Sequence, residues 1–411
     1  MSILSEPRTH RCAATTQSSP VGYKTALCMI VVFVGLICIP AVHQLCIELK
    51  RTGGWRFLVL YQEWPTHASL KRFEETLARD SELATKARRL YRTCQMRWLG
   101  QGNAEIVVGH GGFLFLREEV EMAAGPGFLH RTIKGARGTD VRSNRGNSTD
   151  SITVIVDFER QLRALGIHLV FVPIPAKPFI YPEEVWPGYP TSAGPAWNRD
   201  REAFKTSLGE AGVDVRDVTD DLWRAKFQKG DRLFLKLDTH WTPRGLAVVA
   251  DCLAQHVKRF LPHFVPQAYT SRLTSVTNYG DLLRILEVQP SSGLFHAQTV
   301  EITQLLKGVT LASGDDSSPV LLLGDSFTNI YHRKEMEWGD GAGLGEQLML
   351  RLGHGVQVIA INGGGATAVR ETLKQRPLAL QQKHVVVWAC SARDLYDESI
   401  AWERVAITKR D

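Results

Sequence analysis

The chain lacks several features that would assign it to common classes of protein. Its 7 cysteines include no CxxC pair, which argues against structural zinc and against a redox site. The net charge of +6 is spread along the chain, so nucleic acid is a poor candidate for a partner. No GK[ST] motif follows its glycine-rich segment, which excludes a nucleotide-binding phosphate loop. What remains, 44% hydrophobic and 22% charged, is the composition of a globular protein.

Charged side chains are also absent from one long apolar run, Ala26 to Ile47. About 20 such residues in a helix span the roughly 30 Å hydrocarbon core of a bilayer. A cleaved signal peptide is the main alternative, but Glu48 to Arg51 offer no small-residue cleavage site. The run therefore predicts an uncleaved signal anchor at residues 26–47, with a cytoplasmic tail at residues 1–25. Basic residues flank both ends almost equally, and we place the large domain outside because the preceding tail is short.

The next segment predicts a helical stem. Apolar residues recur at three- and four-residue steps between Ser69 and Leu99, which predicts one amphipathic helix whose stripe packs in a core. The run AEIVVGHGGFLFLREE predicts two short strands joined by the turn Gly109–Gly112. Residues 125–147 are rich in glycine and arginine, which is typical of a mobile loop. We place the stem helix, short strands and loop at residues 48–148 and the main domain at residues 149–411.

In the main domain, short apolar strands alternate with helical stretches. Such strands are typical of a parallel sheet that helices cover on both faces. The predicted fold class is therefore α/β, an open parallel sheet flanked by helices, with sites at the carboxyl ends of strands. The strand candidates are HLVFVPI, VLLLGDS, VQVIAIN and HVVVWAC, and the helix candidates are residues 152–165, residues 199–211 and a segment from Thr242 through Val257.

Ser326 is a candidate nucleophile because it ends the strand VLLLGDS. If Phe327 begins a helix, the amides around Ser326 can stabilise an oxyanion. The GDS triplet alone is weak evidence, since average composition produces it in roughly one of ten chains of this length. A tight turn that Ser326 caps is the competing interpretation.

Asp238 and His240 are the candidates for activating a serine. A serine hydroxyl needs a base, usually a histidine that a carboxylate orients. At i and i+2 of an extended segment both side chains point the same way, so the carboxylate can reach the imidazole. Thr242 and Pro243 then favour a helix start, with threonine as N-cap and proline at N1. An ordinary surface-loop pair is the alternative, because Asp-x-His occurs by chance in about half of such chains.

A third strand end carries glycines instead of acids. VQVIAIN ends at Asn362 and continues with Gly363, Gly364 and Gly365, whose bare amides allow a close approach to a ligand. Gly363 and Gly364 are therefore candidate oxyanion donors. A glycine-rich turn without a binding role is the alternative.

Six segments occur in this order along the chain: VVGHGGFLFL, VPIPAKPFIYPE, LKLDTHWTPRGL, LLLGDSFT, INGGGAT and VVWACSARDLYDESIAW. Together they resemble the SGNH-hydrolase-like proteins of the alginate O-acetyltransferase family, the AlgJ and AlgX type. The resemblance covers roughly residues 70–405, and its most specific parts are DTHWT and the later GDS serine. In that family the Asp-x-His pair precedes the serine, the reverse of ordinary SGNH esterases, and this chain has that order. The resemblance implies Ser326 as nucleophile, His240 as base and Asp238 as its orienting acid.

Two departures bear on the choice between transferase and hydrolase. Family members usually have GTS, whereas Asp325 fills the middle position here, as in GDSL esterases. The GxND block of SGNH esterases is also missing, since Arg393 and Asp394 stand where an asparagine would supply the oxyanion hole. That second departure favours a transferase. Arg393 is a candidate replacement for the asparagine, although it could simply pair with Asp394.

The resemblance implies an O-acetyltransferase that passes an acetyl group to hydroxyls of an exopolysaccharide, without metal or cofactor. It also implies a single-pass protein of the cell inner membrane, closer to the anchored AlgJ type, with a periplasmic catalytic domain. Its partners would be a polysaccharide acceptor and an MBOAT-type membrane acyltransferase that supplies the acetyl group. Two alternatives stay open: an SGNH/GDSL-type carbohydrate or lipid esterase with water as acceptor, and a non-catalytic scaffold of an export complex.

Overall fold

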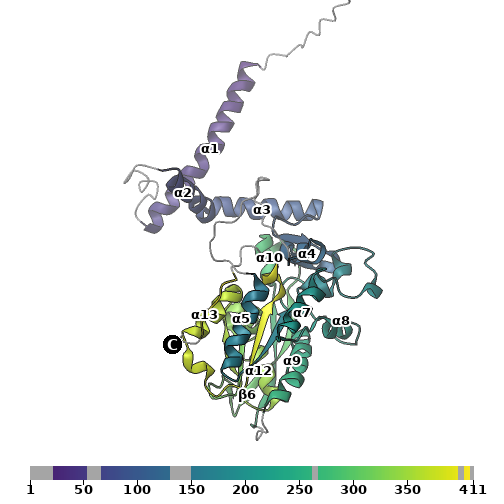
Figure 1. Ribbon diagram of the computed structural model, residues 1–411. Helices are drawn as coiled ribbons and strands as arrows, with labels where there is room; N and C mark the ends of the chain where they lie inside the picture. Colours follow the sequence, from purple (N-terminus) through teal and green to yellow (C-terminus); the bar gives the residue numbers. More distant parts are fainter. Residues whose placement is uncertain (1–21, 53–65, 130–149, 262–266, 397–401, 408–411) are drawn as a thin grey trace, which may run out of the picture. The chain divides into compact units, whose positions relative to one another are not determined.

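The computed structural model describes residues 22–52, 66–129, 150–261, 267–396 and 402–407 (Figure 1). Contacts between residues divide the chain into two compact units, residues 1–88 and residues 89–411. The N-terminal unit contains the long helix α1 (Tyr23–Thr52), which includes the predicted anchor. Its most apolar 18-residue window has a mean hydropathy of 2.7, and the stretch Tyr23–Lys50 is long and apolar enough to cross a membrane. Such a helix near an N-terminus is a feature that membrane anchors and signal sequences share.

The predicted single stem helix is wrong, because two helices occupy this segment. They are α2 (His67–Asp80) and α3 (Glu82–Leu99), and they divide at Ser81. Ser81 Oγ accepts a hydrogen bond from the Ala84 amide at 3.3 Å. A serine in this position satisfies an amide that the first turn leaves unpaired, so it starts a new helix.

The predicted burial of the stem's apolar stripe is also wrong. Tyr91 and Trp98 are 61% and 76% exposed, and Leu90 and Leu99 are similarly exposed. We call these four residues the apolar face of α3. The helix packs through its other side, where Met96 contacts an apolar cluster that includes α10 (Asp281–Leu286). At 100° per residue, Met96 lies roughly 150° around the helix from the centre of the apolar face.

The C-terminal unit is built on a five-stranded sheet in the order β4-β3-β10-β8-β9. All of its strand pairs are parallel, as the apolar runs predict. Successive residues of a central strand point to opposite faces. Leu322 therefore belongs to the core on one face, and Leu323 to the core on the other. The strands are β3 (His168–Ile174), β4 (Asp214–Val215), β8 (Val320–Gly324), β9 (Gln357–Ala360) and β10 (Val385–Ser391).

Helices cover both faces of this sheet, so the predicted fold class is confirmed (Figure 1). The predicted helix after Thr242 is α9 (Pro243–Val257), and the Thr242 side chain accepts a hydrogen bond from the Gly245 amide at 3.2 Å. With α9, α8 (Thr219–Lys226) and α12 (Leu344–Leu352) cover one face, while α5 (Ser151–Ala164), α7 (Arg201–Glu210) and α13 (Gly365–Lys374) cover the other.

Two smaller sheets accompany the main one. The predicted hairpin is present as β1 (Ile106–Val108) and β2 (Leu114–Leu116), and Phe113 and Phe115 join the core of the C-terminal unit. The antiparallel sheet β5-β6-β7 was not predicted, because most residues of β5 are polar and exposed. The loop expected at residues 125–147 lies mostly outside the described residues. The remaining elements are β5 (Thr270–Asn278), β6 (Gln298–Lys307), β7 (Thr310–Leu311), α4 (Arg117–Ala124), α6 (Lys177–Ile180) and α11 (Ser326–Asn329).

Because Leu322 lies in the core on one face of the sheet, Leu322→Ala should strongly lower the free energy of unfolding. This side chain is fully buried in a central strand, so its truncation leaves a cavity and should cost about 2–5 kcal/mol. Denaturant unfolding followed by tryptophan fluorescence measures the change. Leu378→Ala is the matched control, because Leu378 is 71% exposed and should change the free energy of unfolding by less than about 0.5 kcal/mol. Equal effects of the two substitutions would contradict this account of the core.

Candidate active site

The carboxyl ends of β8, β9 and β10 meet at one edge of the sheet. Gly324 at the end of β8 is paired with Ala360 at the end of β9. The amide of Ser391, which ends β10, donates a hydrogen bond to Asp325 Oδ2 at 2.9 Å. The residues that follow these strands therefore share one edge, as expected for the site of an open α/β sheet.

Ser326 begins the single helical turn α11 directly after β8, and 8% of it is exposed. Asp325 caps this turn, since its Oδ1 accepts a hydrogen bond from the Phe327 amide at 2.9 Å. The interpretation of Ser326 as the cap is therefore wrong. Its hydroxyl makes no hydrogen bond with any residue that the structure describes, so it is available to react. The turn has only four residues, so little helix dipole acts on Ser326.

Asp238 and His240 form the predicted pair. His240 Nδ1 lies 2.6 Å from Asp238 Oδ1, and the His240 amide donates to the same oxygen at 3.1 Å. Only 2% of Asp238 and 3% of His240 are exposed. The pair is thus buried and bonded, which a surface-loop pair would not be.

The second oxygen of Asp238 is held by residues that the sequence did not point to. Trp338 Nε1 donates to Oδ2 at 2.9 Å and the Asp281 amide donates to it at 3.0 Å. Burial alone would raise the pKa of the carboxyl, but the hydrogen bond and charge of His240, with Trp338, hold that pKa well below its usual range. Asp238 is therefore a carboxylate that stays ionised in the interior.

The His240 ring keeps one nitrogen without a partner. Among the described residues, its buried Nε2 has no hydrogen bond. The ring packs against Phe327, the neighbour of Ser326, with centroids 4.7 Å apart. Burial would lower the pKa of His240, but the hydrogen bond and charge of Asp238 raise it above the ordinary value. An imidazole bound to a carboxylate at Nδ1 and open at Nε2 has the arrangement of a general base.

Asp281 and Thr239 extend this network. The Thr239 hydroxyl donates to Asp281 Oδ2 at 2.6 Å and lies 3.1 Å from His240 Nδ1. Asp238, His240 and Asp281 place ligand atoms within 4.8 Å of one another, as a metal site would. N–H and O–H donors already engage those carboxylates, however, so the group fits a hydrogen-bonded acid–base network better than a cation.

A buried lysine fixes the segment that carries Asp238. Lys177 is fully buried, and its Nζ donates to the carbonyl oxygens of Leu235, Lys236 and Asp238 at 2.9, 3.1 and 2.7 Å. Burial lowers its pKa to about 8. Because three donor hydrogens meet three carbonyls, the ammonium group acts as a cross-brace on the backbone before His240. Lysine is ordinarily a surface residue, so its burial here depends on these three hydrogen bonds.

Arg393, the candidate oxyanion residue, lies directly after β10 and contacts α4. Its Nη1 is 3.4 Å from Glu119 Oε1, and its Nε is 3.9 Å from Glu118 Oε1. Burial raises the pKa of Asp325, and the charge of Arg393 opposes that rise. Arg393 therefore lies close enough to the residue before Ser326 to affect its ionisation.

Gly363 and Gly364 follow β9 at the same edge. Gly363 has a φ of 65°, a left-handed conformation that glycine adopts without strain. The contact with the serine turn is made by the residue before them, because Asn329 Nδ2 donates to Asn362 Oδ1 at 2.7 Å. Asn329 was not predicted from the sequence, although a polar residue one turn after Ser326 is a usable signal.

A parallel sheet with a serine turn at one strand end and a buried Asp–His pair beside it defines an SGNH-like α/β domain. Residues 106–392 match the family described as "SGNH hydrolase-like domain, acetyltransferase AlgX". Because this match covers more than half of the chain, the protein belongs to that family.

Curated relatives carry a more particular name. A protein of Azotobacter vinelandii named "Probable alginate O-acetylase AlgJ" is 29% identical over 242 residues, which cover 56% of each chain. The protein of that name from Pseudomonas aeruginosa is 28% identical over 236 residues, 55% of this chain and 53% of its own. The chain thus matches about half the length of these relatives. The solved O-acetyltransferase domain of Pseudomonas putida AlgJ has the same fold, with a TM-score of 0.50, 23% identity and coverage of 72% of this chain and 94% of that one.

Glu119 gives the site a stability that depends on pH. The residue is fully buried, and burial raises its pKa from 4.5 to about 7. Between these values the unfolded chain has released the proton that the folded chain still holds. The free energy of unfolding should therefore fall as pH rises from 4.5 to 7, by up to about 3 kcal/mol from this group.

Glu119→Gln should remove that decline, because glutamine does not titrate. The measurement is urea unfolding at several pH values, taken as the difference between variant and wild type. Glu121→Gln is the matched control, since Glu121 lies on the same helix and is exposed. Parallel curves for Glu119→Gln and wild type would show that Glu119 titrates normally.

Proposed function

We propose that this protein is an O-acetyltransferase that uses Ser326, His240 and Asp238 as a catalytic triad. The observation that carries the proposal is the buried Asp238–His240 pair, with His240 Nε2 unoccupied and the ring against the residue after Ser326. Membership of the acetyltransferase family supports the type of reaction.

The reaction has two steps. His240 Nε2 takes the proton of Ser326 Oγ as that oxygen attacks the acetyl carbonyl, and the leaving group departs with the same proton. His240 then takes a proton from a sugar hydroxyl, whose oxygen attacks the acetyl-serine ester. The ester bond to Ser326 breaks, and the serine recovers the proton from His240. Arg393 and the amides of Gly363 and Gly364 are the candidates for stabilising the oxyanion in each step.

The acceptor, on this proposal, is a hydroxyl of an exopolysaccharide. The relatives named as probable alginate O-acetylases favour a polymer of the alginate type. The helix α1 would anchor the chain in the inner membrane with the catalytic domain on the periplasmic side. No acetyl-CoA is expected there, so an MBOAT-type membrane acyltransferase would supply the acetyl group.

Hydrolysis by the same triad is the competing function, and Asp325 was the residue that suggested it. In the structure Asp325 caps the serine turn and accepts the Ser391 amide. This role is indifferent to whether water or a sugar accepts the acetyl group, so it does not favour an esterase.

Ser326→Ala should lower acetyl transfer by about a thousandfold or more, because no nucleophile remains. The full-length protein is incubated with an acetyl ester and oligosaccharides, and acetylated sugar and free acetate are both measured. Ser271→Ala, an exposed serine on β5, is the matched control. Free acetate whose yield no sugar alters would indicate an esterase, and unchanged transfer by Ser326→Ala would exclude the triad.

The pH profile should report the raised pKa of His240. The base works only when neutral, so the rate should rise with pH through a value above 6.5. Asp238→Asn removes the carboxylate, which should move this limb to lower pH and reduce the rate by about 10³–10⁴. Asp231→Asn, an exposed aspartate nearby in the chain, should change neither. If the rise of the rate with pH occurred at the same pH in Asp238→Asn as in the wild type, the proposed pairing of Asp238 with His240 would be refuted.

A further inference from the structure

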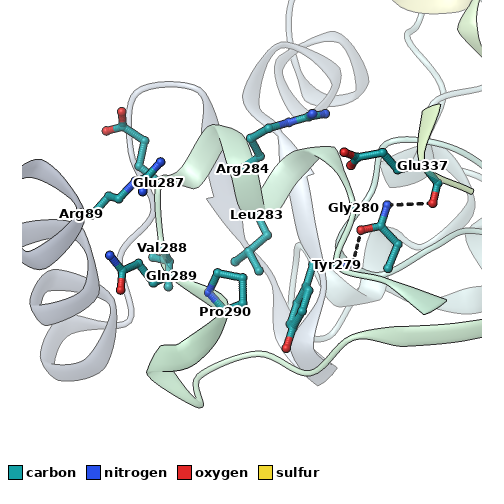
Figure 2. A pocket seen from close by; sticks show the side chains of 11 residues that line it. Arg89, Tyr279, Gly280, Leu283, Arg284, Glu287, Val288, Gln289, Pro290 and Glu337 are labelled. Carbon is teal, nitrogen blue, oxygen red and sulfur yellow. Dashed lines mark hydrogen bonds between the residues drawn. The ribbon is translucent and has the colours of Figure 1, made fainter. Parts of the chain in front are cut away.

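The apolar face of α3 points away from the C-terminal unit, because the opposite side of the helix packs on that unit. Met96 on that side packs on the apolar cluster that includes α10, and Arg97 Nη2 donates to the Ser292 carbonyl at 2.8 Å. Arg89 lies near Met96 around the helix and lines a cavity of about 290 Å³. Figure 2 shows Arg89 on one side of this cavity and Leu283 of α10 on the other. The side of α3 that faces the protein is thus fixed, and the apolar face is exposed in the part of the chain that the structure describes.

Basic side chains border the apolar face on both edges. At 100° per residue the face spans roughly 180°, with Lys86 and Arg97 within roughly 40° of one edge and Arg92 within roughly 40° of the other. None of these three has an ion pair with any residue that the structure describes, and Arg92 donates only to Gln95 Oε1, at 3.0 Å. The whole helix has five basic residues and one acidic residue, Glu82. The apolar face therefore has a border of positive charge that the helix does not neutralise.

The composition of this surface matches the boundary between lipid and water. Tyrosine and tryptophan, here Tyr91 and Trp98, are the residues enriched where headgroups meet hydrocarbon. A helix with a wide apolar face and basic edges lies in the plane of that boundary, and its cations attract anionic headgroups. Only residues 53–81 separate α3 from α1, the proposed membrane anchor, so the chain itself keeps this helix near a bilayer. The rings, the charges and the position in the chain together favour a lipid surface as the occupant.

We propose that the apolar face of α3 binds the surface of an anionic phospholipid bilayer and holds the C-terminal unit against it. Trp98 and Tyr91 lie at the level of the headgroups, and the basic edges contact the lipid phosphates. Met96 packs on the cluster that includes α10, and the amide of Asp281, the first residue of α10, donates to Asp238 Oδ2 at 3.0 Å. The membrane contact is thus joined through one helix to the acid of the proposed triad. The inference goes beyond the proposed acetyl transfer and does not depend on it.

The test places the full-length protein in vesicles of phosphatidylglycerol and phosphatidylcholine whose upper acyl chains carry bromine, which quenches nearby tryptophan. Because the chain has 10 tryptophans, the signal of Trp98 is taken as the difference between the wild type and Trp98→Phe. Bromine should lower this signal by about half or more, since the apolar face of such a helix lies about 5–10 Å deep. Trp223→Phe gives the matched control signal, which should be almost unquenched, because Trp223 is a half-buried tryptophan on α8.

The role of the basic edges is tested by combining Lys86→Gln with Arg92→Gln, which should reduce the quenching of Trp98 at least about twofold. Each variant is compared with its own Trp98→Phe partner. Vesicles of phosphatidylcholine alone should give a similar decrease for the wild type. Arg376→Gln is the matched control, because Arg376 is exposed and lies outside α3. Thermal unfolding midpoints verify that each variant is folded.

An unquenched Trp98 in protein that floats with the vesicles would overturn the inference and leave a protein, such as a second copy of the chain, as the occupant. Equal quenching in neutral vesicles, or an equal decrease in Arg376→Gln, would overturn the recognition of anionic headgroups. None of these signals requires Ser326 to react, so a failure of the proposed chemistry would leave them unchanged.

Discussion

The site depends on one carboxylate held ionised out of water. An unpaired buried charge would be neutralised or would unfold its surroundings, so each oxygen of Asp238 needs donors. The His240 ring and amide engage one oxygen, and Trp338 with the Asp281 amide engages the other. These donors come from three separate segments of the chain. The carboxylate is therefore a junction: it fixes the imidazole, and it also draws together loops that the sheet alone would leave apart.

The surrounding buried charges have a related function. Lys177 braces the carbonyls before His240, while Glu119 pairs with Arg393, which follows β10. Both groups lie where desolvation acts against their charged forms, lowering the pKa of Lys177 and raising that of Glu119. Burying these two groups costs stability, but it positions the backbone before His240 and the guanidinium of Arg393. Such a cost is common where a site must be held in one geometry.

What could be predicted from the sequence follows from how local each signal is. The apolar strands, the turn at Gly109–Gly112 and the Thr242 cap are encoded within a few residues, and the structure contains them. Trp338 and Asp281 could not be found in this way, because they reach Asp238 from 100 and 43 residues away. The polar strand β5 lacks the alternation of apolar and polar residues that marks a strand. Ser81 was missed as a helix boundary because the helical spacing of apolar residues continues on both sides of it. Periodicity correctly found the stripe of α3, but it cannot distinguish a face that packs inward from one that stays outside.

The apolar face of α3 has a practical consequence. Leu90, Tyr91, Trp98 and Leu99 remain exposed, while Met96, on the other side of the helix, packs against an apolar cluster of the C-terminal unit. Arginines flank this face, a pattern that suits the boundary between lipid headgroups and water. Cutting the chain after α1 would remove the long apolar helix but leave this surface, since these four residues belong to the C-terminal unit. A truncated protein prepared for solution work would thus still bind micelles or self-associate. An anomalous elution from a size-exclusion column would then reflect the exposed apolar face of α3, not an incomplete fold.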